Sequence, residues 1–378
     1  MAYGTVNADV IQSSVANTSL GAGNASIMKN RIINGAMVIS QRYGTSSTTP
    51  SATASNVYIL DRFFYAQSQA SKFSIQQLSS SPPAGFSNYM GLTTASAVSI
   101  GSSDYFFTGQ VIEGFNWADL GWGTANAKTV TLSFWVQSSL TGTFGGSLQN
   151  YNQNRSYPFS YTISSANTWT QISITVTGDT GGTWAGATNA GSLELNFGLG
   201  VGSTLSGTAG SWSANNYLSA TGATSVVGTN GATFYITGVQ LEVGSSATGF
   251  EYRQYGQELA LCQRYAYVIS GNSPYQNGYS RYPCFGSGTN GCIWYAQYPV
   301  QMRTSPSLIT NSFTSSSMEL YNYSTATAPT FSAITIAEGD VWHGQVVITS
   351  TNNISSGNIV SWRWQNIQNA YVGFSAEL

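Results

Sequence analysis

The segment TVTLSFWVQ, residues 129–137, shows the pattern on which the fold of this chain depends. Its apolar side chains recur at every second position: Val130, Leu132, Phe134 and Val136. Because successive side chains of a β-strand point to opposite faces, this period of two predicts a strand with one buried face. Trp135 alternates out of phase with Phe134, so one of the two rings must face away from the core, toward a partner subunit or a second sheet.

The same alternation recurs in QISITV (171–176), SLELNFGLG (192–200) and ATFYITGVQLEVG (232–244). In the last segment the buried phase changes at Gly238, where a β-bulge would re-aim the strand. Segments rich in Gly, Ser, Thr, Asn and Pro separate these strands, as turns require. Many short strands without alternating helices predict an all-β chain, a sandwich or a jelly roll rather than a parallel sheet.

One segment, QYGQELALCQRYAY (254–267), departs from the β pattern. It spaces Tyr255, Leu259 and Cys262 at i, i+4 and i+7, which predicts a short amphipathic helix that links two domains. We therefore expect an extended N-terminal arm, a first β-domain and a second, smaller C-terminal β-domain, with these boundaries: 1–29, 30–252 and 253–378. Strands of the C-terminal domain are predicted at 291–300, 318–323, 331–339, 341–350, 360–365 and 369–378.

The composition limits the classes of partner. Only 7% of residues are charged and the net charge is −2, so the chain offers no basic field for nucleic acid or anionic lipid. The N-terminus lacks a secretory signal pattern, and no apolar run approaches the roughly 18 residues of a membrane span. Lysine occurs only at Lys29, Lys72 and Lys128, so few charges protect the sheet edges, and symmetric self-association is expected.

The residues that usually carry metal or nucleophilic chemistry are scarce. Three cysteines (Cys262, Cys284 and Cys292) and one histidine, His343, lack the paired short spacings of a zinc site. Cys284 and Cys292 flank a predicted hairpin loop. We expect two reduced thiols packed as small apolar groups, with a disulfide across the hairpin as the alternative. His343 has no nucleophile motif around it and is expected to be packed or hydrogen-bonded.

Aromatic and uncharged polar side chains are abundant, which suits recognition of neutral, hydroxyl-rich ligands such as sugars. The densest candidate glycan site is the polar, turn-like segment 275–282: Tyr275, Gln276, Asn277, Tyr279, Arg281 and Tyr282. Secondary candidates are Trp117, Asp119, Trp122, Tyr151, Arg155 and Tyr157, with Trp184 in a similar Gly-rich setting. The alternative for any single Trp is a buried position in the core or an interface.

Hydrolysis of a glycan would need two carboxylates that face one bond. The acids Asp104, Glu113 and Asp119 lie close in sequence, and Glu194 alternates opposite Leu193 and Leu195, so it is expected on a solvated strand face. No pair of these acids has a motif-level signal, and the chain is therefore predicted not to be an enzyme.

Several phrases, in their order along the chain, resemble a family of tailed-bacteriophage virion proteins that includes tail fibres. The phrases are KNRIINGAMVISQR (29–42), LDRFFYAQ (60–67), LSFWVQSS (132–139), the segment 236–267, YPVQMRTSPSL (298–308) and the ending FSAEL. The resemblance implies a carbohydrate-binding-module-like jelly roll and a homotrimer. It also implies an N-terminal arm that attaches to other virion proteins. A structural Ca²⁺ ion fits such a jelly roll, although no ligand spacing identifies its site, and no other cofactor is predicted.

The leading hypothesis from the sequence is a tail-fibre or receptor-binding subunit, synthesised in a bacterial cytoplasm and located in the phage particle. Its C-terminal domain would contact host surface polysaccharide. One alternative is a capsid-decorating or tail-adaptor protein without a receptor role, because the chain lacks a long fibre shaft. A glycan depolymerase is the second alternative.

Overall fold

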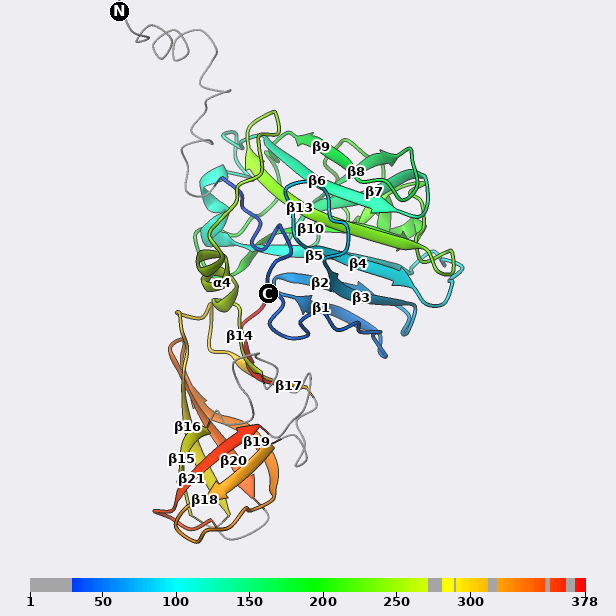
Figure 1. Ribbon diagram of the computed structural model, residues 1–378. Helices are drawn as coiled ribbons and strands as arrows, with labels where there is room; N and C mark the ends of the chain where they lie inside the picture. The colour runs from blue at the N-terminus through cyan, green and yellow to red at the C-terminus, as the bar shows by residue number, and fades with distance from the viewer. Residues whose placement is uncertain (1–28, 271–280, 289, 312–317, 351–353, 365–370) are drawn as a thin grey trace, which may run out of the picture. The chain divides into compact units, whose positions relative to one another are not determined.

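The computed structural model describes residues 29–270, 281–288, 290–311, 318–350, 354–364 and 371–378 (Figure 1). The chain divides into two compact units by its contacts. Of the described residues, 29–38, Ser47–Arg253 and Leu378 belong to the first unit, and those within Ile39–Ser46 and Gln254–Glu377 belong to the second. The predicted arm 1–29 lies outside the described residues, apart from Lys29.

The first unit is a jelly-roll β-sandwich of two antiparallel sheets, which confirms the predicted fold class. The five-stranded sheet contains, in spatial order, β3 (Phe73–Leu78), β4 (Tyr89–Thr94), β13 (Thr233–Val243), β6 (Val130–Ser138) and β9 (Thr170–Val176). The six-stranded sheet contains β1 (Ala54–Leu60), β2 (Phe63–Gln67), β5 (Tyr105–Glu113), β10 (Gly191–Val201), β7 (Gly142–Asn150) and β8 (Ser156–Ile163).

The two sheets bury the residues that the alternation predicts. Phe134 of β6 lies 5.0 Å from Phe197 of β10 and 5.1 Å from Tyr161 of β8, measured between ring centroids. These contacts join strands of opposite sheets, so they form the centre of the sandwich core. Trp135 points to the other face of its sheet and is half-buried.

The β-bulge predicted at Gly238 is confirmed. The register between β13 and β6 shifts between Thr237 and Gln240, and Gly238 has a φ of 62°. A Cβ at this position would lie 2.6 Å from the ring of Phe86. Glycine is therefore required both for the left-handed backbone and for the close approach.

The outer face of the six-stranded sheet is covered along β10, contrary to the expectation of a solvated face. The chain after β10 forms three short elements: η3 (Ser203–Leu205), β11 (Ser206–Gly207) and β12 (Ser219–Ala220). A Cβ at Gly145 or at Gly198 would meet the side chain of Ser219, so β12 lies directly on β7 and β10. Further along the same face, Glu194 lies opposite Gln149, whose side chain bonds to Asn216 of the segment before β12. Glu194, predicted to be solvated, is only 1% exposed.

The second unit is also a β-sandwich. Its three-stranded sheet contains β14 (Ala266–Ser270), β22 (Tyr371–Ser375) and β17 (Ser307–Asn311). Its six-stranded sheet contains β18 (Met318–Asn322), β21 (Ile359–Trp364), β15 (Arg281–Gly286), β16 (Gly291–Gln297), β20 (His343–Ser350) and β19 (Phe331–Gly339). Phe374 of β22 packs on Trp294 of β16, with 6.1 Å between ring centroids, and joins the two sheets.

The predicted linking helix is present but shorter, and its buried face differs. Helix α4 spans Tyr255–Gln263, and the chain continues as β14. Its buried residues are Glu258 and Cys262, whereas Tyr255 is 64% exposed. Side chains lean toward the N-terminus of a helix, so that of the first residue extends beyond the packed turn. No helix among the described residues has the length and hydropathy of a membrane span.

Cys284 and Cys292 lie on the strands β15 and β16 of the predicted hairpin. Both thiols are buried, and no disulfide joins them. A hydrogen bond with the Cys292 thiol, together with burial, raises the pKa of Cys284. Both residues therefore pack as small, unreactive core side chains.

The segment Ile39–Ser46 packs within the second unit, although it lies far from that unit in sequence. Arg42 forms a buried ion pair with Glu377 at 3.2 Å, and the rings of Tyr43 and Tyr371 meet edge to face at 6.1 Å. The linear boundary at residue 253 did not anticipate this contribution, because the contacts join residues more than 300 positions apart.

Candidate functional site

Three connections of the first unit emerge at the same end of the sandwich. They join β5 to β6, β7 to β8, and β9 to β10. Gly191 at the start of β10 pairs with Glu113 at the end of β5, and Val130 at the start of β6 pairs with Val176 at the end of β9. The antiparallel registers thus bring 114–129, 151–155 and 177–190 together.

Five aromatic side chains from these connections, from the start of β8 and from the segment before β12 form one group, which we call the end-loop cluster: Trp117, Trp122, Trp184, Trp212 and Tyr157. Trp122 is central, with ring centroids 4.7 Å from Trp117, 4.8 Å from Trp184 and 5.2 Å from Trp212. Tyr157 lies 5.4 Å from Trp212. Trp117 and Trp122 are buried, whereas the other three rings are half-buried.

Three of the indole N–H groups in the cluster donate to a fixed acceptor, whereas that of the buried Trp117 has no partner among the described residues. Trp122 donates to the Lys128 carbonyl at 2.7 Å, and Trp212 donates to the Thr177 carbonyl at 2.8 Å. Trp184 donates to Asp179 Oδ2 at 3.1 Å. These bonds set the orientation of each ring before any ligand arrives, so binding needs little further ordering.

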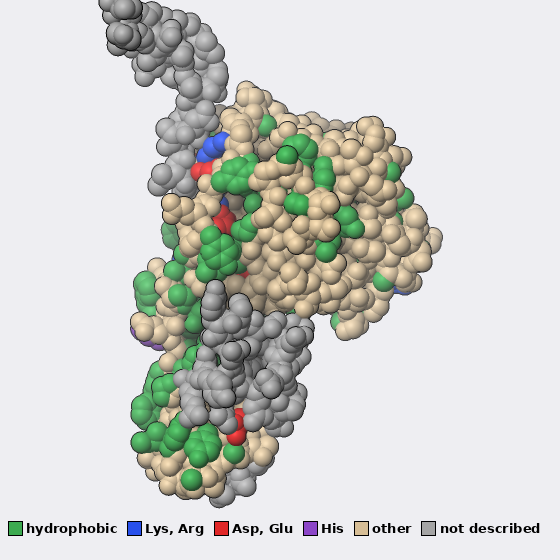
Figure 2. All heavy atoms as spheres, in the orientation of Figure 1, with side chains coloured by type: hydrophobic (Ala, Val, Ile, Leu, Met, Phe, Trp, Pro, Cys, Tyr) green, Lys and Arg blue, Asp and Glu red, His purple; other side chains and the backbone are tan. Residues whose placement is uncertain are grey.

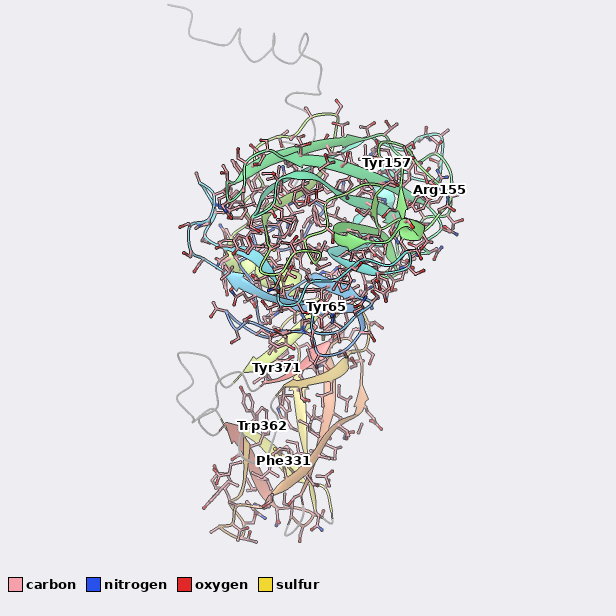
Figure 3. The ribbon with its side chains drawn as sticks, turned by 90° about the vertical axis from the view of Figure 1, so that its right-hand side faces the viewer. Tyr65, Arg155, Tyr157, Phe331, Trp362 and Tyr371 are labelled. Atoms are coloured by element: carbon pink, nitrogen blue, oxygen red, sulfur yellow. The ribbon has the colours of Figure 1, made fainter. Side chains whose placement is uncertain are left out.

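One ion pair links the β7–β8 connection to the β9–β10 connection. Arg155 donates from Nε to Asp179 Oδ2 at 3.0 Å and from Nη2 to Asp179 Oδ1. The hydrogen bonds with Asp179 raise the pKa of Arg155. The guanidinium carbon lies 5.9 Å from the ring centroid of Trp212, within reach of a cation–π contact. Figure 3 shows Arg155 and Tyr157 near each other in the first unit.

Arg155→Lys is expected to destabilise the first unit by about 2 kcal/mol, although the charge is kept. A lysine cannot make the bidentate pair, and Asp179 is almost fully buried. The measurement is the free energy of unfolding from urea denaturation. Arg31→Lys is the comparison: Arg31, itself 8% exposed, also makes two bonds to a carboxylate, but that of Asp119 is 52% exposed and stays accessible to water, so a smaller loss of about 1 kcal/mol is expected. Equal losses in both variants would contradict the interpretation.

The structure gathers most of the secondary candidates in this cluster. Trp117 and Trp122 have covered ring faces and serve as support rather than as contact surfaces. Asp119 accepts two bonds of 2.8 Å from Arg31, which occupy its carboxylate. Tyr151 is exposed in the same connection as Arg155. The rings open to a ligand are thus those of Trp184, Trp212, Tyr157 and Tyr151.

The segment 275–282 is placed only in part. Tyr275, Gln276, Asn277 and Tyr279 lie outside the described residues. Arg281 is the first residue of β15, opposite Arg363 of β21. Tyr282 stacks on Trp362 with 4.1 Å between ring centroids and an interplanar angle of 19°, so it belongs to the core of the second unit.

Trp212 and Asp179 complete the cluster, but the sequence interpretation did not single them out. Trp212 lies in SWSANN, which has the same mixture of aromatic and uncharged polar residues as the other candidate segments. That composition could have identified it. Asp179 lies in TGDTGG, which was interpreted as a turn, and Gly182 does have a turn-like φ of 76°. No local signal indicates that its carboxylate meets Arg155.

Each carboxylate that was considered for hydrolysis has a structural role or a buried position in the folded protein. Asp104 accepts bonds from the Gly101 amide and from Ser68, which lower its pKa. Glu113 is buried, and Asp119 pairs with Arg31. No three His, Cys, Asp or Glu side chains of the described residues converge as a metal site. The structural Ca²⁺ ion stays a prediction.

Glu194 differs from the other acids, because no hydrogen bonds to its carboxylate compensate for its burial. Neither of its carboxylate oxygens has a hydrogen-bond partner among the described residues, and the same holds for Oδ1 of the buried Asn196. In the register of β10, Glu194 lies between Val111 of β5 and Gln149 of β7, both uncharged. Burial raises the pKa of Glu194 to about 7, although contacts with Asn196 and Gln153 lower it.

Some solved structures of other proteins are similar to this chain in fold, although the sequence identities are low. No protein-family model and no curated protein matches the chain. Among solved structures, the enzymatically active domain of tailspike protein 4 from bacteriophage CBA120 matches with 14% identity and a TM-score of 0.31. The match covers 57% of this chain and 21% of that one, so this chain spans about a fifth of its length.

A family 11 carbohydrate-binding module of a Clostridium thermocellum cellulosomal cellulase also matches. The identity is 14% and the TM-score 0.26, with coverage of 56% of this chain and 99% of the module. At these TM-scores neither similarity carries a conclusion about the activity of this chain.

Proposed function

We propose that this chain is a structural protein of a bacteriophage particle, a tail-fibre or receptor-binding subunit that binds host surface glycans without cleaving them. The end-loop cluster is the proposed glycan contact. The observation that supports it is a set of half-buried aromatic rings, held by indole hydrogen bonds, at the loop end of a rigid sandwich. Function concentrates on such loops, because the scaffold holds them while their sequence varies.

The chemistry of the cluster fits a neutral polyol. The flat faces of Trp184, Trp212 and Tyr157 can cover the apolar face of a pyranose ring. The uncharged polar side chains of Asn152, Gln153, Asn154 and Asn215 are exposed in the same connections and can bond to hydroxyl groups. Because the rings are already ordered, a sugar would lose little binding energy to side-chain entropy.

Trp212→Ala is the direct test. We expect a loss of glycan affinity of about tenfold or more, because a ring that contributes stacking area is removed. The probe is a microarray of bacterial surface polysaccharides, followed by calorimetry with the polysaccharide that wild-type protein binds best.

Trp169→Ala is the matched control for Trp212→Ala. Trp169 is also half-buried and also donates its indole N–H to a carbonyl, that of Ser81. It lies between β8 and β9, at the opposite end of the sandwich, so its removal should leave affinity unchanged. Wild-type affinity in Trp212→Ala, or equal losses in both variants, would reject the end-loop cluster as the contact.

The finer parts of the proposal follow the sequence resemblance. Residues 1–29 would attach the protein to other virion proteins, three copies would assemble, and the second unit would present a further receptor contact that includes 275–282. Immunogold labelling of intact particles tests the location. Label on the tail supports a fibre, whereas label on the head supports the capsid-decorating alternative. A fragment used to test the second unit should include Ile39–Ser46, because Arg42 and Tyr43 bond within it.

A further inference from the structure

The outer face of the six-stranded sheet in the second unit carries an unbroken row of apolar side chains. Ile359 of β21 pairs with Phe285 of β15, and Phe285 pairs with Ile293 of β16. Ile293 in turn pairs with Val347 of β20. Ile359 and Phe285 are each 62% exposed, and Ile293 and Val347 are half-buried. The row therefore crosses four hydrogen-bonded strands.

Aromatic side chains widen this row into a patch. Tyr295, two residues beyond Ile293 on the same face of β16, is 61% exposed. Tyr323, whose amide bonds to the Ile359 carbonyl at 2.9 Å, is 44% exposed. Its ring lies 4.9 Å from that of Tyr321. Figure 2 shows hydrophobic side chains gathered in the region of β15, β16 and β21. We call Ile359, Phe285, Ile293, Tyr295 and Tyr323 the sheet-face patch.

An apolar outer face is not expected on a sheet whose outer side is exposed to water. An antiparallel sheet usually packs one face on the core and keeps the other polar. Here the inward residues Cys284, Trp294 and Val360 already form the core, and the outward residues are apolar as well. A contiguous exposed apolar patch of this kind marks an interaction surface.

The charge of the face restricts its partner. The neighbouring outward residues on the same strands are Ser361, Pro283 and Gln345, all uncharged. The charged Glu338 of β19 lies opposite Gln345, at the margin of the face. A strongly hydrated partner would bury polar groups here without bonds in return. A fitting partner presents a flat, apolar and uncharged surface.

We infer that the sheet-face patch packs against a second copy of this chain, around a symmetry axis. The patch itself is apolar and uncharged, so the same patches of neighbouring copies offer a complementary surface where they face a common symmetry axis. In a standard interface each partner buries about 800 Å² of its surface. The exposed area of the large side chains in the patch is about half of that value. Ile293, Val347 and Tyr321 extend this area. The inference depends on the proposed function in one respect: a structural protein of a phage particle is present there in several copies.

The double variant Phe285→Ser/Ile359→Ser tests the interface in the full-length chain. Both side chains are exposed, so the variant should fold with unchanged circular dichroism. The dissociation constant for self-association should rise at least about a hundredfold, because two central apolar contacts are lost. Sedimentation equilibrium measures the mass of the assembly. Phe115→Ser, which changes an exposed aromatic residue of the first unit, is the control and should keep the wild-type mass.

Three outcomes are decisive. A folded double variant of lower mass, with Phe115→Ser unchanged, supports the interface. A folded double variant with wild-type mass overturns it, as does a monomeric wild-type protein. Glycan binding is measured on the same samples. Binding that persists in a monomeric double variant separates the patch from the glycan site. A monomeric wild type that loses glycan binding in the double variant assigns the face to a glycan instead.

Discussion

Trp122→Ala is expected to lower the free energy of unfolding by about 3–5 kcal/mol and to abolish glycan binding. Trp122 is buried and contacts three further indole rings, at interplanar angles of 86°, 88° and 84°. Its removal would leave a cavity beneath Trp184 and Trp212, the two indoles that are open to a ligand. The variant therefore loses both packing energy and the fixed geometry of the contact surface.

Urea denaturation followed by near-ultraviolet circular dichroism measures the stability of Trp122→Ala, and calorimetry measures its binding. Trp169→Ala serves again as the control, because its ring lies outside the end-loop cluster and meets the ring of Tyr89 rather than three indole rings. Its expected loss of stability is smaller, about 1–2 kcal/mol, with unchanged binding. A Trp122→Ala variant that binds glycans with wild-type affinity while folded would show that the cluster is only a structural core.

Glu194→Gln is expected to stabilise the protein at pH 8 by up to about 3 kcal/mol. The pKa of Glu194 is raised to about 7 in the folded chain, mainly by burial, from an ordinary value of 4.5. Between these two pH values the folded state binds more protons than the unfolded state. The stability of the wild type therefore falls as the pH rises from about 4.5 to 7 and stays low above that range. Glutamine carries no charge at any pH, so the variant loses this slope.

The pH series also tests how the protonated form of Glu194 is satisfied. A carboxyl proton can be donated to Oδ1 of Asn196, which otherwise lacks a partner among the described residues. The amide of Glu194→Gln can make the same bond, so variant and wild type should have similar stability at pH 4. Urea denaturation at pH 4 to 8 provides the measurement.

Glu242→Gln is the matched control for the burial argument. Glu242 is also buried, but it accepts bonds from Gln240 and from both the amide and the hydroxyl of Thr248. Loss of its charge should destabilise the protein at pH 8 rather than stabilise it. A stabilising Glu242→Gln, or a wild-type profile without a slope between pH 4.5 and 7, would contradict the interpretation of Glu194.

Local sequence patterns predicted the positions of strands more accurately than they predicted which strand faces are exposed to solvent. The alternation in 129–137 identified the inward residues of β6, and the phase change at Gly238 located the bulge. The segment 331–339 coincides with β19. By contrast, the alternation in 192–200 predicted a solvated face for Glu194. That error arose because the segment before β12, more than twenty residues further along, packs on this face, where Asn216 bonds to Gln149 opposite Glu194.

The candidate site was predicted only as separate fragments. Composition identified Trp122, Arg155, Tyr157 and Trp184 as polar-aromatic candidates, without indicating that they meet. Trp117 and Trp122 were grouped with these contact candidates, yet they lie beneath the open rings. Burial of a particular Trp depends on which loops close over it, and no local pattern carries that information.

By itself, the sequence determined the β architecture, the main strand phases, the bulge and the low charge of this protein. These properties follow from the period of neighbouring side chains and from composition, which act over a few residues. Only the tertiary structure decided that four connections join in one aromatic cluster and that Glu194 is buried. It also decided that Ile39–Ser46 packs with the second unit and that an apolar row crosses four strands. Each of these depends on strand order and register, which join residues that are distant along the chain.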